Sequence, residues 1–124
     1  MKSVPYADLL TVPYKDKGRG IDGLDCYGLV LEMCRRADTP LLDLVFDSLK
    51  TATDENGNAR AYINLREIPK EKARAGTIVQ CEDNDILHIG YMLDKIRVLH
   101  MTGAGAKVTP IQALKNIVFF EVVK

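Results

Sequence analysis

The sequence predicts an α+β domain in which N-terminal helices pack on one face of an antiparallel sheet. Apolar residues follow helical spacing in the first half of the chain, and the second half consists of short β-type runs separated by turn residues. The length of 124 residues is that of one domain, and a hydrophobic fraction of 47% with 27% charged residues is ordinary for a globular protein. We therefore interpret residues 1–124 as a single domain.

The first half begins with a short helical lead-in and a polar, Gly-rich loop, both within residues 1–20. Helical spacing of apolar residues then runs from Leu24 to Cys34 and predicts a helix. Asp22 or Asp25 can cap its start, and Pro40 is expected to stop it.

The chain after Pro40 predicts a second helix at about residues 41–49 and a polar surface loop at residues 51–60. Short runs of β-forming residues follow, and Gly, Asp and Asn residues separate them. This change of character is what favours an α+β fold over other classes. The predicted strands are residues 77–81, 88–93, 96–101 and 117–123.

The charge balance excludes some classes of function. Lys plus Arg and Asp plus Glu each number 17, so there is no basic excess to bind nucleic acid or an anionic membrane. No stretch approaches the roughly 20 apolar residues that cross a bilayer. The N-terminus has no apolar run typical of a signal peptide, so a cytoplasmic or virion-associated protein is expected rather than a secreted one.

The three cysteines are expected to have different roles. An odd number without a C-x-x-C motif indicates neither a disulfide framework nor a zinc cluster. Cys26 lies at the predicted helix start, where the helix dipole lowers the pKa of a thiol and favours the thiolate. Cys34 lies on the apolar side of the helix and Cys81 in a strand, so both are predicted to be buried structural thiols.

The chain's two histidines, His88 and His100, lie in one predicted hairpin and are twelve residues apart. An odd-length loop around Asp94 would place them on the same face of the sheet, whereas a two-residue loop would place them on opposite faces. Either histidine alone is more often a structural residue than a catalyst. Together with Cys26 they offer a nucleophile, a base and an orienting group, which is the minimal set for nucleophilic catalysis.

Five short motifs resemble those of the NlpC/P60 family of papain-like cysteine peptidases. They occur in the family's order and extend over most of the chain. They are a loop similar to P-Y-x-x-G-G (12–20), L-D-C-Y-G-L-V (24–30), A-G-T-I-V (75–79), H-I-G-Y-M (88–92) and V-L-H (98–100).

The resemblance implies a papain-like NlpC/P60 fold with about five strands, and a thiol protease that hydrolyses the peptide stem of peptidoglycan after γ-D-glutamate. It implies Cys26 as nucleophile, His88 as base and His100 as the group that orients His88. Backbone N–H groups at the helix start would bind the oxyanion. No cofactor is implied. A zinc site made of the same three residues is disfavoured because the Asp-Cys helix start is typical of a nucleophile.

Three further residues are expected to support the oxyanion or the substrate. The Tyr14 hydroxyl would donate a hydrogen bond there, although a packed loop aromatic is an equal alternative. Asp25 and Tyr27 flank Cys26 in the motif, and a helix-terminal acid is the favoured interpretation of Asp25. Lys15, Lys17 and Arg19 are candidates to attract an anionic peptide stem, with a solvated loop favoured.

Departures from the family's pattern point to one of its branches. Thr77 replaces the usual Asp, and Met101 replaces the usual small residue after the third polar group. Tyr27 stands where cell-wall enzymes mostly carry Ser and phage-tail members mostly carry Trp, which resembles the phage-tail or prophage branch. The expected partners are therefore a peptidoglycan stem peptide and phage tail proteins. Two alternatives remain: a catalytically silent tail-tip or assembly protein, and an amidase or acyltransferase acting on a non-wall substrate.

Overall fold

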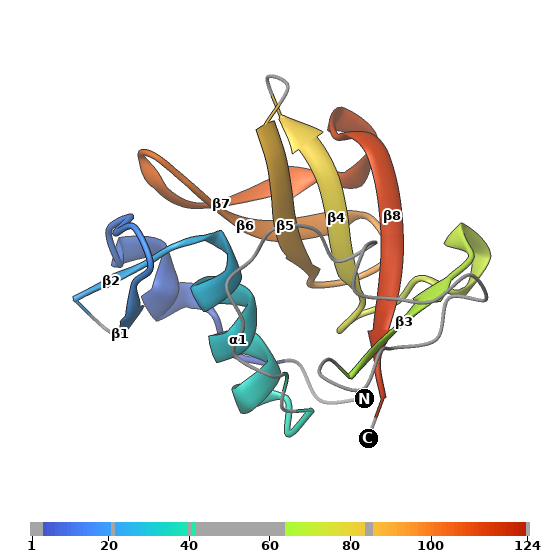
Figure 1. Cartoon of the computed structure of the whole chain (residues 1–124), viewed down its shortest axis with the longest axis horizontal. Coiled ribbons are helices and arrows are strands. Elements are labelled where there is room, and N and C mark those ends of the chain that lie inside the picture. The colour runs from blue at the N-terminus through green and yellow to red at the C-terminus, as the bar shows by residue number, and fades with distance from the viewer. Residues whose placement is uncertain (1–3, 21, 40, 42–63, 84–85, 124) are drawn as a thin grey trace.

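A computed structural model of the protein describes residues 4–20, 22–39, 41, 64–83 and 86–123. Within them, one α-helix lies against a six-stranded antiparallel sheet in the order β3-β8-β4-β5-β6-β7 (Figure 1). In Figure 1, β6 and β7 run crosswise to β4, β5 and β8, so the sheet is strongly curled. The helix is α1 (Cys26–Arg36), and the strands of this sheet are β3 (Leu65–Ile68), β4 (Ile78–Asp83), β5 (Ile86–Met92), β6 (Arg97–Thr102), β7 (Gly105–Pro110) and β8 (Lys115–Val122).

The architecture confirms the α+β class and corrects its details. The sheet has six strands rather than about five, because β3 and β7 were not predicted. The second expected helix, at residues 41–49, and the polar loop at residues 51–60 lie outside the described residues except for Leu41. The four predicted strands are present with slightly different ends, as β4, β5, β6 and β8.

The N-terminal segment is more structured than the sequence indicated. The lead-in is a 3-10 helix, η1 (Ala7–Thr11), and the Gly-rich loop leads into a small antiparallel hairpin of β1 (Arg19–Gly20) and β2 (Gly23–Leu24). Leu24, predicted to begin the helix, therefore ends β2, and the helix begins at Cys26. Two short 3-10 turns, η3 (Lys70–Lys72) and η4 (Ile111–Ala113), connect strands of the main sheet. None of the helices in the described ranges combines the length and the apolar character needed to span a membrane.

Helix α1 begins and ends through local hydrogen bonds. The Asp25 carboxylate accepts a 2.6 Å hydrogen bond from the backbone N–H of Gly28, which makes Asp25 the N-cap. At the other end Asp38 adopts the left-handed region (φ 59°), and the N–H groups of Asp38 and Thr39 donate to the carbonyls of Arg35 and Cys34. This is a Schellman motif, so the helix ends before Pro40, which was predicted to stop it.

Both faces of the sheet are apolar because consecutive residues of its central strands are buried, and successive side chains point to opposite faces. One face packs against α1, and its buried side chains join those of the helix in the larger core. The opposite face forms a second core enclosed by the curl of the sheet. The first core includes Tyr27, Leu29, Met33, Ile78, Ile89, Tyr91, Leu99 and Phe120, and the second consists of Ile68, Val79, Met92, Val98 and Phe119.

The turn between β5 and β6 sets the faces of the two histidines. The N–H of Leu93 donates to the carbonyl of Arg97, which leaves a three-residue loop. The Asp94 carboxylate closes this loop by accepting hydrogen bonds from the N–H groups of Ile96 and Arg97 at 2.9 and 2.8 Å. The loop length is therefore odd, and His88 and His100 lie on the same face of the sheet, as one of the two alternatives predicted.

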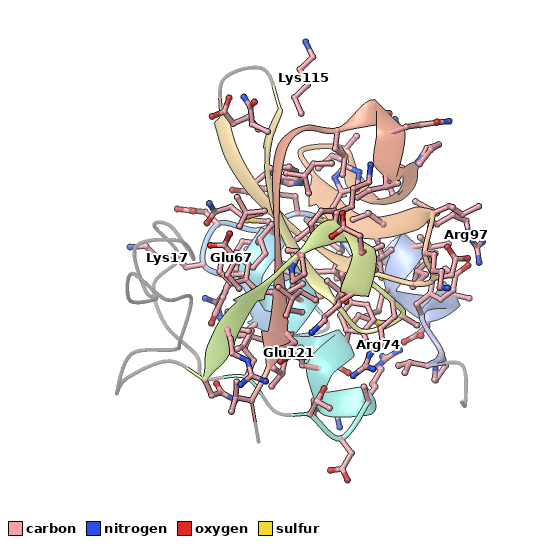
Figure 2. The ribbon with its side chains drawn as sticks, turned by 90° about the vertical axis from the view of Figure 1, so that its right-hand side faces the viewer. Lys17, Glu67, Arg74, Arg97, Lys115 and Glu121 are labelled. Carbon is pink, nitrogen blue, oxygen red and sulfur yellow. The ribbon has the colours of Figure 1, made fainter. Side chains whose placement is uncertain are left out.

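Charged side chains of both signs project from separate parts of the surface. Figure 2 shows Lys17, Lys115 and Arg97 at three different margins of the molecule, with Glu67 and Glu121 between them. This distribution agrees with the balanced composition of 17 basic and 17 acidic residues.

Candidate active site

The start of α1 is held in place by the loop that precedes it. A Cβ atom at Gly28 would overlap the carbonyl oxygen of Gly18, so only glycine allows the helix to approach the loop this closely. Arg19 then joins the two segments, because its Nη1 donates to the Gly18 carbonyl at 2.8 Å and to Asp25 Oδ1 at 2.7 Å. Cys26 is consequently fixed as the first residue of the helix, directly after its N-cap.

The Cys26 sulfur lies against the edge of β5. Strand β5 pairs with β4 along Ile86–Tyr91, whereas the described register with β6 is confined to Gly90–Met92. The two strands therefore separate before Ile89, and the backbone N–H of Ile89 hydrogen-bonds the sulfur. The sulfur therefore lies at the peptide bond that joins His88 to Ile89.

The protonation of Cys26 differs from the sequence-based expectation. Burial, and after it the negative charge of Asp25, raise the pKa of the Cys26 thiol above its ordinary value. Hydrogen bonds from the backbone N–H groups of Ile89, Tyr27 and Cys26 itself favour the thiolate but do not outweigh these two effects. The prediction that the helix start alone lowers this pKa is therefore wrong, and a thiolate at neutral pH needs a base to accept its proton.

His88 and His100 form a hydrogen-bonded pair. His88 Nε2 lies 2.8 Å from His100 Nδ1, and the rings meet nearly edge to face, with an interplanar angle of 84°. His100 is 4% exposed, and its Nε2 lies 2.7 Å from the hydroxyl of Thr109 on β7. The structure thus contains a continuous line of polar groups from Thr109 through His100 to His88, and the Cys26 sulfur contacts the backbone N–H of Ile89, the residue that follows His88.

Gly90 allows this pairing because it lies directly opposite His100 in the β5–β6 register. A Cβ atom at Gly90 would overlap Val98 Cγ1 and crowd the Leu99 carbonyl, so a side chain there would force the two strands apart. The glycine of the H-I-G motif is therefore required by close strand packing next to the histidines.

The three residues predicted to support the oxyanion or the substrate lie in three different environments. Tyr14 is 44% exposed and its backbone forms a β-bridge with Leu24. Partial burial, and then the charges of Asp16, Asp25 and Cys26, raise the pKa of Tyr14. Asp25 is the N-cap of α1, as favoured, and is ion-paired with Arg19. Tyr27 is 1% exposed in the core, which argues against the substrate-supporting role predicted for it.

The basic residues of the loop are largely engaged within the protein. Lys15 pairs with Asp22 at 3.0 Å, and the Arg19 guanidinium lies 5.8 Å from the centre of the Tyr27 ring in addition to its contact with Asp25. These contacts favour a structural role for both side chains over capture of an anionic substrate. Thr109 was missed as a site residue, since only its partner His100 stood in a motif. Arg19 was predicted to lie in a solvated loop or to attract the substrate rather than to hold Asp25.

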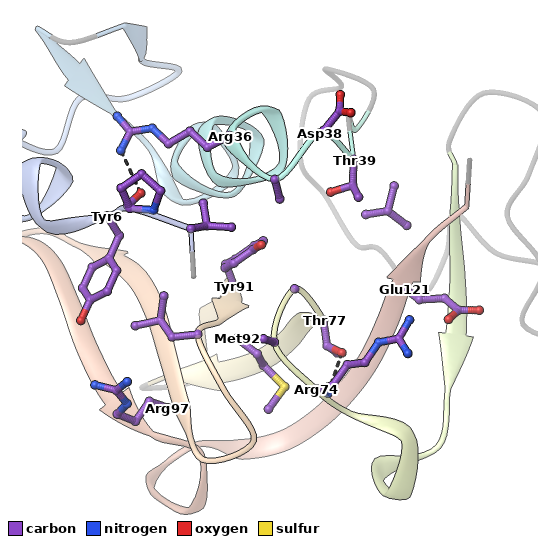
Figure 3. Close-up of a pocket in the computed structure, with 17 residues that line it drawn as sticks. Tyr6, Arg36, Asp38, Thr39, Arg74, Thr77, Tyr91, Met92, Arg97 and Glu121 are labelled. Atoms are coloured by element: carbon purple, nitrogen blue, oxygen red, sulfur yellow. Dashed lines mark hydrogen bonds between the residues drawn. The ribbon is translucent and has the colours of Figure 1, made fainter. Parts of the chain in front are cut away.

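A pocket of about 650 Å³ lies at the opposite end of α1 (Figure 3). Its lining includes Arg36, Tyr91 and Arg97 but none of the residues that make up the cysteine–histidine site. Arg36 is bonded to Asp8, and Arg97 is bonded to Asp94, so these two guanidinium groups are already neutralised. We therefore place the candidate active site at Cys26 and His88 and not in this pocket.

Among the described residues, no group of three or more His, Cys, Asp or Glu side chains is arranged to hold a metal ion.

Comparisons with known proteins identify the fold. No protein-family model matches the sequence, and no curated protein is similar to it. A search of solved structures finds the NlpC/p60 domain of the peptidoglycan hydrolase SagA, with a TM-score of 0.63 and 18% sequence identity, over 95% of this chain and 92% of that one. The chain has the NlpC/p60 fold. The shared NlpC/p60 architecture confirms the resemblance that the ordered motifs indicated.

Proposed function

We propose that this protein is a cysteine endopeptidase that hydrolyses γ-D-glutamyl–diamino acid bonds in peptidoglycan stem peptides. The observation that carries the proposal is the 2.8 Å hydrogen bond between His88 and His100, formed on the strand against which the Cys26 sulfur lies. A partly buried thiol at the strand that carries an oriented imidazole fits the arrangement that nucleophilic acyl transfer requires.

The first half of the reaction makes a thioester. Because His88 Nε2 faces His100, Nδ1 is the nitrogen that accepts the proton of the Cys26 thiol. The thiolate attacks the peptide carbonyl carbon, and the C–S bond forms as the carbonyl electrons move to oxygen. When the oxyanion collapses, the C–N bond breaks, and His88 gives its proton to the leaving amine.

The second half restores the enzyme. His88 Nδ1 takes a proton from water, whose oxygen attacks the thioester carbon and forms a second oxyanion. Its collapse breaks the C–S bond, releases the carboxylic acid and returns the thiolate to Cys26. The backbone N–H groups at the start of α1 point toward the sulfur, and the Tyr14 hydroxyl is a further donor, so these groups support both oxyanions.

The choice of substrate rests on similarity. The structural neighbour is a domain of a peptidoglycan hydrolase, and the ordered motifs resemble those of enzymes that cleave the stem peptide. We extend the proposal to a phage-tail or prophage protein, because the aromatic residue Tyr27 after the cysteine resembles that branch of the family. Tyr27 lies in the core, where an aromatic ring fills the space between α1 and the loop that carries Arg19.

Defined muropeptides test the proposal. The purified protein should release a new amine from the diamino acid of a stem peptide that contains γ-D-glutamate, measured by mass spectrometry of the products. The matched substrate carries an α-linked glutamate at the same position and should be cleaved far more slowly. Equal cleavage of both would contradict the bond assignment, and release of amine from simple amides alone would favour the amidase or acyltransferase alternative.

The silent structural alternative makes a different prediction. In a tail-tip or assembly protein that does not use the chemistry, the wild type and Cys26→Ala would both leave every muropeptide intact. Phage particles carrying Cys26→Ala would then infect as well as the wild type. Infection that depends on Cys26 while particle assembly does not would support an active tail hydrolase.

A further inference from the structure

His100 has both of its ring nitrogens committed. Nδ1 lies 2.8 Å from His88 Nε2, and Nε2 lies 2.7 Å from the hydroxyl oxygen of Thr109. The residue is 4% exposed, so solvent does not readily substitute for either partner. A neutral imidazole carries one proton, which means that it donates through one nitrogen and accepts through the other. The partner of Nε2 therefore determines whether His100 Nδ1 donates a hydrogen bond to His88 or accepts one from it.

The direction of these hydrogen bonds determines whether His88 can act as a base. If Thr109 accepts a proton from His100 Nε2, then His100 Nδ1 accepts from His88 Nε2, and His88 Nδ1 is left with a lone pair for the thiol. In the reverse direction, the Thr109 hydroxyl donates, His100 donates to His88, and the proton of His88 sits on Nδ1. That second state cannot take a proton from Cys26.

The sheet holds Thr109 at this position. Strand β7 pairs with β6 from Arg97–Pro110 to Thr102–Gly105, and Thr109 lies opposite Val98, one diagonal step from His100 on the same face. Thr109 is half-buried, and β7 is the edge strand next to β6. The hydroxyl is thus delivered by a fixed register rather than by a loop.

We infer that Thr109 is a positioning residue, a fourth member of the relay, whose hydroxyl accepts the Nε2 proton of His100 and so sets the tautomers of both histidines. The inference rests on the proposed role of Cys26 and His88. Replacing the hydroxyl with a methyl group leaves His100 Nε2 facing an apolar group, which favours the tautomer with its proton on Nδ1. His88 is then held in the state that cannot accept the thiol proton.

The experiment compares Thr109→Val with Thr109→Ser by the rate of Cys26 alkylation with iodoacetamide as a function of pH. Thr109→Val should lower the rate near pH 7 by about 10- to 100-fold, the range found when a metal-binding histidine loses its outer hydrogen-bond partner. It should also shift the profile to higher pH, while Thr109→Ser restores both. A wild-type rate and profile in folded Thr109→Val would overturn the inference.

Thr102→Val provides the matched control. Its hydroxyl lies in the same hairpin but bonds the Gly105 carbonyl and the Ala104 N–H, so its loss should leave the alkylation profile unchanged. The charged groups nearest the relay, Lys107 opposite His100 and the Asp25–Arg19 pair beside Cys26, are retained in all of these variants.

A measurement on the wild type covers the case in which Thr109→Val fails to fold. Nitrogen-15 NMR of the histidine rings should show His100 protonated at Nε2, and a proton at Nδ1 would overturn the inference. His88→Ala separates this result from the proposed function. If His88→Ala leaves Cys26 alkylation unchanged, the proposed cysteine–histidine pair is wrong. If His88→Ala changes the alkylation rate and Thr109→Val does not, only the role inferred for Thr109 is wrong.

Discussion

Two thiols on one helix show what makes a cysteine reactive in this protein. Cys26 opens α1 and is partly buried, whereas Cys34 lies near its end and is fully buried. Burial raises the pKa of both thiols, and it raises that of Cys34 to about 12. Cys26 differs because three backbone N–H groups favour its thiolate, one of them that of Ile89, the residue after His88 on β5. The immediate partners of each sulfur therefore distinguish the two thiols more than burial does.

The largest expected effect comes from removing each sulfur in turn. Cys26→Ala should lower kcat/KM for stem peptide hydrolysis by about 10⁴-fold or more, because the nucleophile is lost. Cys34→Ala should leave kcat/KM close to the wild-type value and lower the free energy of unfolding by roughly 1–2 kcal/mol, the cost of a small cavity. Steady-state kinetics and urea denaturation measure the two quantities. Comparable kinetic losses in both variants would contradict the distinction between the thiols.

The second effect concerns the position of the helix start. Gly28→Ala places a methyl group against the Gly18 carbonyl and should shift Cys26 relative to His88. A displacement of about 1 Å is enough to lower kcat by roughly 100-fold. Gly103→Ala is the matched control, since a Cβ atom at Gly103 has no neighbour within 4 Å. If both variants keep full activity, the contact between Gly18 and Gly28 does not position the nucleophile.

The third effect is the pH dependence of the thiols. In His88→Ala the Cys26 thiol keeps its raised pKa without a base, so it is protonated at neutral pH and its thiolate increases only as pH rises through that pKa. Its alkylation rate should still be rising above pH values of about 8.5, the ordinary pKa of cysteine. Below its pKa, each pH unit lowers the thiolate fraction, and with it the alkylation rate, about tenfold. Peptide mapping should find Cys26 labelled well before Cys34 or Cys81, both fully buried. A profile for His88→Ala that levels off below pH 8 would contradict the assigned pKa shift.

The smallest effect is expected at the other end of the helix. Arg36 joins α1 to the N-terminal segment through Asp8 and the Pro5 carbonyl, and it also bonds Glu32. Because Asp8 is largely exposed, Arg36→Gln should lower the melting temperature by no more than about 4 °C, with a smaller shift at high salt. Arg35→Gln, which loses only its bond to Glu32, should shift it less. Neither variant should change Cys26 alkylation, and a change would show that the two ends of the helix are coupled.

The central part of the fold could be predicted from the sequence, and its edges could not. Central strands such as β4 and β5 are buried on both sides, so their apolar runs are visible. Strands β3 and β7 lie at the two edges of the sheet, where a strand tolerates charge and proline. β3 has two exposed charged residues at its centre, and β7 begins with Gly105 and ends with Pro110.

The candidate site was also predictable in its central residues but not in its outer partner or in the direction of the thiol pKa shift. Cys26, His88 and His100 stood in ordered motifs, and the parity of the hairpin allowed the histidine pair that the structure contains. Thr109 was missed together with its strand, because nothing in the sequence placed β7 beside His100. The direction of the Cys26 pKa shift was missed because it depends on burial and on the Asp25 charge, and neither is set by position along a helix.

The reacting groups come from two distant parts of the chain. Cys26 belongs to the N-terminal helix, while His88, His100 and Thr109 belong to strands that are synthesised later. A growing polypeptide that has exposed only α1 therefore carries an isolated sulfur with no proton acceptor. The proposed hydrolysis requires both parts, so it can begin only after the C-terminal hairpins have formed and the helix has docked against them. A pair of separately expressed fragments, cut between residues 41 and 64, should each fail to hydrolyse stem peptides and should regain hydrolysis only when they associate.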